Sequence, residues 1–277
     1  MIWEDAFPTS PLFKFLSLAD GQYPPWQDRV SAYLEGKAYL SSPLAFNDPF
    51  DCLPPVLLPK TLDEFEEQKP AFAQRLHQSM PHMSVADITS VIDQAIGNSS
   101  IDAFTEITRE SFNNSGAQMG VFCLAECIQS VLMWSHYADN HKGIALRFEF
   151  RGRLDCGLMP LFKVRYSSER AALTAFFSGD NQAEAITTAL CTKAEFWKYE
   201  QEWRFVEPAG AGKTIEFDPK VITSIVLGAK TRDEDAFWLI DQGIKRGIPV
   251  MRVIPNPETF DLGFFGVHDP SGPKPSL

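Results

Sequence analysis

Apolar and polar positions are most clearly ordered in the stretch 121–150. It opens with the apolar run Val121-Phe122-Cys123-Leu124, which has the length and composition of a buried strand. A polar turn and the segment 131–141 follow, and Gly143 ends that segment. Residues 144–150 then alternate apolar and polar side chains, which is typical of a half-buried strand. The pattern predicts a strand, a short helix and a second strand.

Similar patterns predict elements along the rest of the chain. Short strands are expected at 12–16, 37–42, 160–166, 196–206, 222–227 and 249–254. Helices are expected at 26–36, 63–78, 85–96, 101–113, 181–194 and 232–246, several with a capping residue in front or a glycine behind.

These elements predict a mixed α+β fold with a mostly antiparallel, split sheet. We expect a single domain over residues 1–254, with a helical insertion at 61–115 between two strand-rich parts. Residues 255–277 are rich in proline and glycine and are predicted to form a tail.

Composition narrows the class of protein. A net charge of -11 over 277 residues argues against extended nucleic-acid binding, since such proteins usually carry a basic face. No apolar run reaches the roughly 20 residues that span a bilayer, so no membrane association is expected. The acidic start does not resemble a secretory signal, and five scattered cysteines are typical of reduced thiols, which predicts a cytoplasmic protein.

Several common sites are missing from the sequence. The chain has no glycine-rich phosphate loop, no HExxH zinc motif and no GxSxG nucleophile elbow. Cys123 and Cys127 form the only close cysteine pair and lack a second pair to complete a zinc site. We therefore expect no metal.

The segment 131–141 gathers amphipathic rings. On a continuous helix, Trp134, Tyr137 and His141 would share one face, and His136 would lie on an adjacent one. Rings with N–H or O–H groups usually find partners when buried, so the segment predicts either a ligand pocket or a hydrogen-bonded core.

The motif Phe46-Asn47-Asp48-Pro49-Phe50-Asp51 has strong turn chemistry. Asn and Asp side chains bond nearby backbone N–H groups, and proline fixes φ. The motif is therefore either an Asx-type turn anchored by its two phenylalanines or a substrate loop that presents Asn47, Asp48 or Asp51.

A third candidate is the run 196–206. On a strand, Glu200, Glu202 and Arg204 would lie on one side, with Trp203 and Phe205 on the other. A like-charged neighbour raises one carboxyl pKa while an arginine keeps the other carboxyl ionised, which suits a catalytic or binding strand. The alternative is an exposed strand face with a screened ion pair.

Taken in order, these motifs resemble a bacterial family known as domain of unknown function twenty-nine seventy-one. The resemblance spans nearly the whole chain and is most specific at the motif 46–51 and at Met133-Trp134-Ser135-His136-Tyr137-Ala138. The family label names no reaction.

The order of elements also resembles the ADP-ribosyltransferase-like fold, in which three strand-borne motifs line an NAD cleft. By that resemblance Lys14 stands for the first motif, in place of the usual arginine or histidine. Ser41 and Ser42 stand for the second, and Glu200-Gln201-Glu202 for the third.

The resemblance implies NAD as a substrate and a role for each residue. Glu202 would stabilise the oxocarbenium-like transition state, and Glu200 would orient the acceptor. Ser41 would bind the nicotinamide ribose, Lys14 or Arg204 the pyrophosphate, and His136 or Tyr137 would stack on nicotinamide or act as acid and base. The predicted site has Glu202, Glu200 and His136 as catalytic residues and Lys14, Ser41, Ser42, Asn47, Asp48, Trp134, Tyr137, His141 and Arg204 as substrate-binding residues.

Two other classes of function remain open. The first is a ligand-sensing or phage-defence binding module that recognises a nucleotide or phage signal without turnover. The second is a metal-dependent hydrolase, although His136 and His141 would diverge by about 140° on a helix, which is poor ligand geometry. The sequence identifies no protein partner.

Overall fold

The structure is a computed structural model that describes residues 8–21, 24–97, 101–150, 157–158, 160–174 and 182–271. Its largest feature is an eight-stranded sheet with the order β14-β13-β12-β5-β1-β4-β10-β6. The strands are β1 (Leu12–Leu16), β4 (Gly120–Ala125), β5 (Ile144–Phe148), β6 (Leu161–Lys163), β10 (Glu202–Glu207), β12 (Ile222–Leu227), β13 (Val250–Pro255) and β14 (Leu262–His268). Within this sheet only β12 and β13 pair in parallel. The predicted α+β class with a mixed, mostly antiparallel sheet is confirmed.

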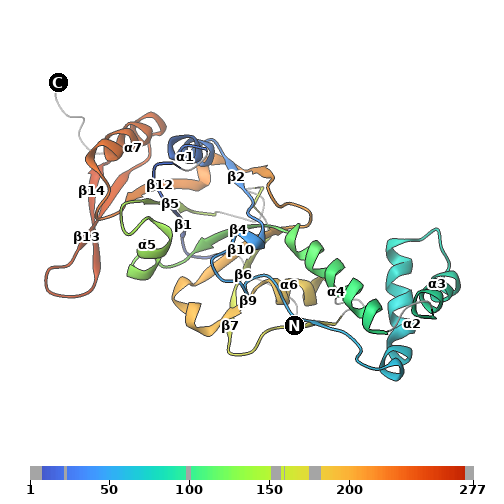
Figure 1. Ribbon diagram of the computed structural model, residues 1–277. Helices are drawn as coiled ribbons and strands as arrows, with labels where there is room; N and C mark the ends of the chain where they lie inside the picture. Colours follow the sequence, from blue (N-terminus) through green and yellow to red (C-terminus); the bar gives the residue numbers. More distant parts are fainter. Residues whose placement is uncertain are drawn as a thin grey trace.

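Helices cover both faces of the sheet (Figure 1). On one face, α1 (Trp26–Leu34) and α7 (Asp233–Arg246) meet through an edge-to-face contact between Trp26 and Trp238 at 5.1 Å. The other face carries α5 (Val131–Tyr137), whose Trp134 packs edge to face on Phe15 of β1, also at 5.1 Å. The parallel pair β12 and β13 is joined through α7, as parallel neighbours require.

The sheet opens between β1 and β4. These strands share a single register pair, Phe13↔Ala125, whereas β1 pairs along its whole length with β5. The chain at Ser41 enters the gap and forms an antiparallel bridge with Val121. Lys14 spans the gap with its side chain, since Nζ donates to the carbonyl of Cys123 at 3.1 Å.

Three helices fill the range predicted as a helical insertion. They are α2 (Leu62–Ser79), α3 (Val85–Gly97) and α4 (Ile101–Ala117). Figure 1 shows α2 and α3 lying to one side of the sheet. The insertion has a small apolar core of its own, formed by Phe65, Ala73, Ile88 and Ile92.

Short elements complete the fold. Three two-stranded ladders join β2 (Lys37–Tyr39) to β11 (Thr214–Glu216), β3 (Val56–Leu57) to β8 (Leu173–Thr174), and β7 (Arg165–Ser167) to β9 (Thr192–Ala194). The remaining elements are helix α6 (Gln182–Leu190) and the 3₁₀ turns η1 (Pro43–Ala45), η2 (Glu195–Glu200) and η3 (Pro219–Val221).

Several predicted elements differ from the structure. The strand predicted at 160–166 is divided into β6 and β7, which pair with β10 and β9 respectively. The helix predicted at 181–194 ends at Leu190, because the next residues pair with β7 as strand β9. The strand predicted at 196–206 begins only at Glu202, since the residues before it form η2 and Gln201 has a left-handed backbone with φ of 46°. The predicted tail contains β14, whose pairing with β13 supplies order that its glycines do not favour.

The described helices contain none that is long and apolar enough to cross a membrane.

Candidate functional site

A pocket of about 150 Å³ lies where the sheet opens. Strands β1 and β4 form two of its walls, and the segment 41–51 closes a third side. Its lining combines apolar and ionisable side chains, namely Phe13, Lys14, Phe15, Ser41, Phe46, Asn47, Asp51, Val121, Cys123, Leu124, Ala125, Met133, Tyr137, Lys193, Glu200 and Glu202. A cavity of this size holds a benzene-sized molecule, so it admits a single ring rather than a whole dinucleotide.

Local turn chemistry fixes the segment that brings Asn47 and Asp51 to the pocket. Ser42 caps η1 by accepting from the N–H of Leu44, and its hydroxyl donates to the carbonyl of Ala117 at 2.7 Å. Asp48 is buried and accepts from the N–H of Phe50 at 2.9 Å, which is an Asx turn. Ser42 and Asp48 therefore have structural roles in the loop, whereas Ser41, Phe46, Asn47 and Asp51 of this segment line the pocket.

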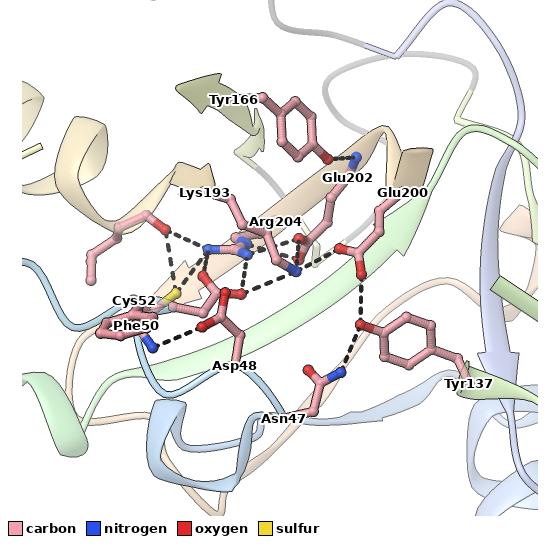
Figure 2. A network of polar contacts seen from close by, with 12 residues as sticks. Asn47, Asp48, Phe50, Cys52, Tyr137, Tyr166, Lys193, Glu200, Glu202 and Arg204 are labelled. Atoms are coloured by element: carbon pink, nitrogen blue, oxygen red, sulfur yellow. Dashed lines mark hydrogen bonds and ion pairs between the residues drawn. The ribbon is translucent and has the colours of Figure 1, made fainter. Parts of the chain in front are cut away.

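One wall of the pocket contains a cluster of buried ions, which we call the ion cluster: Asp51, Lys193, Glu200, Glu202 and Arg204. All of them except Arg204 line the pocket. Figure 2 shows Lys193, Glu200, Glu202 and Arg204. Arg204 on β10 is fully buried, and all five of its N–H donors are used. Nε and Nη2 donate to the two oxygens of Glu202, both at 2.8 Å, and Nη2 also donates to Asp51 Oδ2 at 2.8 Å. Nη1 donates to the Leu190 carbonyl at 2.6 Å and to Cys52 Sγ at 2.9 Å. Arg204 therefore has no donor left for a pyrophosphate, and the structure gives it a positioning role instead.

Lys193 is the second cation of the cluster. Its ammonium bonds Glu200 Oε2 and lies 3.2 Å from Glu202 Oε2 and 3.1 Å from Asp51 Oδ2. Burial opposes its charge, but the three carboxylates together raise the pKa of Lys193 above its usual value, so it stays protonated. Sequence reasoning missed Lys193, because the residues before it continue a helical pattern and its carboxylate partners come from other segments of the chain.

Glu200 and Glu202 reach the same cation from different elements. Burial and the charge of Glu202 raise the pKa of Glu200, while Lys193 acts against that rise. Burial also opposes ionisation of Glu202, but Arg204 and Lys193 outweigh it and hold the pKa of Glu202 well below its usual range. The opposed pKa shifts that the sequence suggested therefore occur, even though Glu200 lies on η2 and not on the strand.

A chain of hydrogen bonds links Glu200 to the mouth of the pocket. Asn47 Nδ2 donates to the Tyr137 hydroxyl at 3.4 Å, and that hydroxyl donates to Glu200 Oε1 at 2.6 Å (Figure 2). Burial, followed by the charge of Glu200, raises the pKa of Tyr137, so the phenol keeps its proton. Both Glu200 oxygens are thus held in place, one by Tyr137 and one by Lys193.

The other residues predicted on 131–141 lie elsewhere. Trp134 is fully buried in the core and donates Nε1–H to the carbonyl of Ile128 at 2.7 Å. His136 is exposed and contacts the rings of Trp197 and Tyr199 outside the pocket lining. His141 faces Ser135, with 3.2 Å between Nε2 and Oγ.

The predicted shared face fails because α5 ends at Tyr137. Asp139, Asn140 and His141 all have left-handed backbones, with φ of 47°, 53° and 70°. The chain therefore leaves the helix axis before His141, and Tyr137 alone of the predicted rings reaches the pocket.

Metal ligation finds no support in the described residues, among which no cluster of three or more His, Cys, Asp or Glu side chains could hold a metal ion. Cys52, Cys123, Cys127 and Cys191 are free thiols, whereas Cys156 lies outside the described residues. Burial raises the pKa of Cys52 and raises that of Cys191 to about 12, so both remain neutral thiols.

Comparison with known proteins identifies one family. Residues 133–205 match the model of a family described as a protein of unknown function (DUF2971), which confirms the resemblance over that part of the chain. The matched range runs from α5 through Lys193, Glu200, Glu202 and Arg204. No curated protein and no solved structure matches the chain, so the resemblance to ADP-ribosyltransferases stays a prediction.

Proposed function

We propose that the pocket between β1 and β4 binds the nicotinamide end of NAD and that the protein cleaves the bond between nicotinamide and ribose. The observation that carries this proposal is the pair Glu200 and Glu202, whose pKa values shift in opposite directions beside a pocket the size of one ring. Two carboxyl groups tuned apart in this way are typical of sites where one side chain stays charged while the other exchanges a proton.

The lining suits a planar amide-bearing ring. Phe13, Phe15, Phe46 and Met133 supply apolar contacts for the ring. Asn47 and Ser41 supply hydrogen-bonding groups at the same pocket for a carboxamide. NAD would enter with its ring first, and its remaining parts would extend outside the enclosed volume.

Glu202 is the residue best suited to stabilise positive charge. Its carboxylate stays ionised near neutral pH and lines the pocket. When the C1′–N1 bond breaks, its electron pair returns to the pyridinium ring, which leaves as neutral nicotinamide, and positive charge develops on the ribose. A fixed carboxylate stabilises that charge without reorganising. Arg204 and Lys193 are positioning residues that hold Glu202 in place.

Glu200 is the residue best suited to move a proton. In its ionised form it would accept the proton of the attacking water or acceptor hydroxyl as the new bond to C1′ forms. Tyr137 and Lys193 fix the orientation of the carboxylate. Of the two residues predicted to bind the pyrophosphate, Lys14 remains the candidate, because it lines the pocket and its ammonium is bonded only to the Cys123 carbonyl among the hydrogen bonds described.

The test is a thermal-shift titration with NAD followed by an assay of nicotinamide release. We expect saturable stabilisation by NAD and release that falls about 100-fold or more in Glu200→Gln. Glu207→Gln at the exposed end of β10 is the matched control and should keep wild-type release. Glu202→Gln is less suitable alone, because it removes a charge that pairs two buried cations.

Two results would contradict the proposal. No stabilisation at millimolar NAD together with no release would rule it out. Stabilisation by NAD without release would instead support the ligand-sensing module.

A further inference from the structure

The carboxylate that would activate the acceptor is closed off from the protein surface. Glu200 is 2% exposed, and Glu202 is 5% exposed. Lys193 bonds one oxygen of Glu200, and the Tyr137 hydroxyl bonds the other. A side chain of another protein needs access from the surface to reach such a group, whereas a water molecule needs only a gap of its own size. The burial of Glu200 therefore limits the size of the acceptor.

Two side chains lie between Glu200 and solvent, and we call them the Asn47–Tyr137 cover. Asn47 is exposed on the segment 41–51, and Tyr137 is half-buried at the end of α5. Their hydrogen bond of 3.4 Å joins positions 90 residues apart in the sequence. The bond of 2.6 Å from the Tyr137 hydroxyl to Glu200 Oε1 then keeps the phenol against the carboxylate (Figure 2). Exposure falls along this chain from Asn47 to Glu200, so the cover separates the carboxylate from bulk solvent.

A neighbouring cavity gives no second route to the carboxylates. It has a volume of about 190 Å³ and shares Asp51 and Lys193 with the first pocket. Neither Glu200 nor Glu202 lines it. An acceptor in that cavity would meet Asp51 and Lys193, which are paired with each other, and not the carboxylate that takes the proton. An acceptor that reaches Glu200 therefore shares the first pocket with the substrate ring.

Glu200 keeps the capacity to bind one water molecule. A carboxylate has about four lone-pair positions, and the hydrogen bonds described for Glu200 use one on each oxygen. A water at one of the remaining positions would give a proton to Glu200 while its oxygen bonds C1′.

We propose that the acceptor is water, so that the protein is a hydrolase that converts NAD and water into nicotinamide, ADP-ribose and a proton. This inference rests on the proposed cleavage of NAD. The bond between C1′ and the nicotinamide nitrogen breaks, and its electron pair stays on that nitrogen. The water oxygen forms the new bond to C1′, and one water proton passes to Glu200 and then to solvent. The Asn47–Tyr137 cover keeps larger alcohols and amines away from Glu200.

The test separates acceptors by size. The full chain is incubated with NAD labelled in its adenine, together with methanol or with agmatine, an amine that carries a guanidinium group like that of arginine. With agmatine we expect nicotinamide and ADP-ribose in equal amounts and no label on agmatine or on the protein. With methanol we expect a minor methyl ADP-ribose product. Chromatography measures the products, and mass spectrometry measures the protein.

A variant tests the cover. Asn47→Ala removes one half of it and should raise the ratio of methyl ADP-ribose to ADP-ribose, because methanol then reaches Glu200 more easily. Glu207→Gln at the exposed end of β10 is the matched control and should keep the wild-type ratio. The ratio of two products does not depend on the fraction of the variant that is folded.

Three results would overturn the inference, and they differ in what they leave standing. Release of nicotinamide with label on agmatine or on the protein would overturn the assignment of water and leave the cleavage of NAD in place. An unchanged methanol ratio in Asn47→Ala would overturn the role of the cover. No release of nicotinamide would overturn the proposed function and this inference with it.

Discussion

Helix α5 and the ion cluster are both rich in side chains with polar groups, but these groups find their partners in different ways. On α5, the indole of Trp134 bonds a nearby carbonyl within the core, while His136 points to the surface. In the ion cluster, Arg204 bonds its near neighbour Glu202 and also Asp51, which lies 153 residues away in the sequence. Bonds within a few residues stabilise a local turn. Bonds across 150 residues fix one arrangement of the whole fold, and here that arrangement faces a pocket.

The comparison predicts the largest loss of stability at Arg204. Arg204→Met would leave Asp51 and Glu202 buried without their main cation, and we expect the free energy of unfolding to fall by about 3–5 kcal/mol. Chemical denaturation measures the loss. Arg147→Met is the control, because that half-exposed arginine pairs with Glu149 near the surface and its loss should cost at most about 1 kcal/mol. Equal effects of the two substitutions would contradict a central role for the ion cluster.

A smaller loss is expected on α5. Trp134→Phe leaves a gap in the core and leaves the Ile128 carbonyl without its donor, so the free energy of unfolding should fall by about 1–3 kcal/mol. The affinity of the folded protein for NAD should not change, because Trp134 does not line the pocket. Thermal unfolding with and without NAD measures both quantities. A loss of NAD affinity at a temperature where the variant is folded would show that Trp134 contributes to NAD binding.

The smallest effect concerns the pH dependence of stability. The folded-state pKa of Glu200 lies above its unfolded value of about 4.3, so Glu200 takes up a proton on folding between these two pKa values. Its contribution to stability therefore falls as the pH rises from about 4.3 through the folded-state pKa. The lowered pKa of Glu202 has the opposite sign, so its contribution is present above about pH 4.3 and is lost as the pH falls.

Glu200→Gln should therefore remove the component of stability that decreases with rising pH. Melting temperatures measured from pH 4 to pH 8 for both proteins test this, with Glu207→Gln as the exposed control. An unchanged profile in Glu200→Gln would show that Glu200 does not titrate in this window.

Much of the fold could be predicted from local patterns. Strands β1, β4 and β5 and helix α7 follow from apolar runs, alternation and a glycine at a helix end. Strand β14 could not be predicted, because its glycines disfavour a strand and its order comes from pairing with β13.

The site could be predicted in part. Glu200, Glu202, Tyr137 and Asn47 were identifiable by residue type and motif, and all four line the pocket. The positioning role of Arg204 could not be predicted, because its N–H donors bond partners up to 153 residues away in the sequence. Lys193 was hidden for the same reason, since the residues before it continue a helical pattern and its carboxylate partners come from three other segments.

The single register pair between β1 and β4 makes this the place where two parts of the sheet can move relative to each other. One group of paired strands consists of β14, β13, β12, β5 and β1, and the other consists of β4, β10 and β6. The two groups are connected by the pair Phe13↔Ala125 and by the hydrogen bond from Lys14 to the Cys123 carbonyl. Hydrogen-bonded pairing between neighbouring strands limits how far a sheet can twist, and here the pairing between β1 and β4 is reduced to one register pair. A molecule bound in the gap would contact both groups of strands and reduce their motion relative to each other. Occupancy of the pocket would therefore lower the mobility of strands far from the ligand.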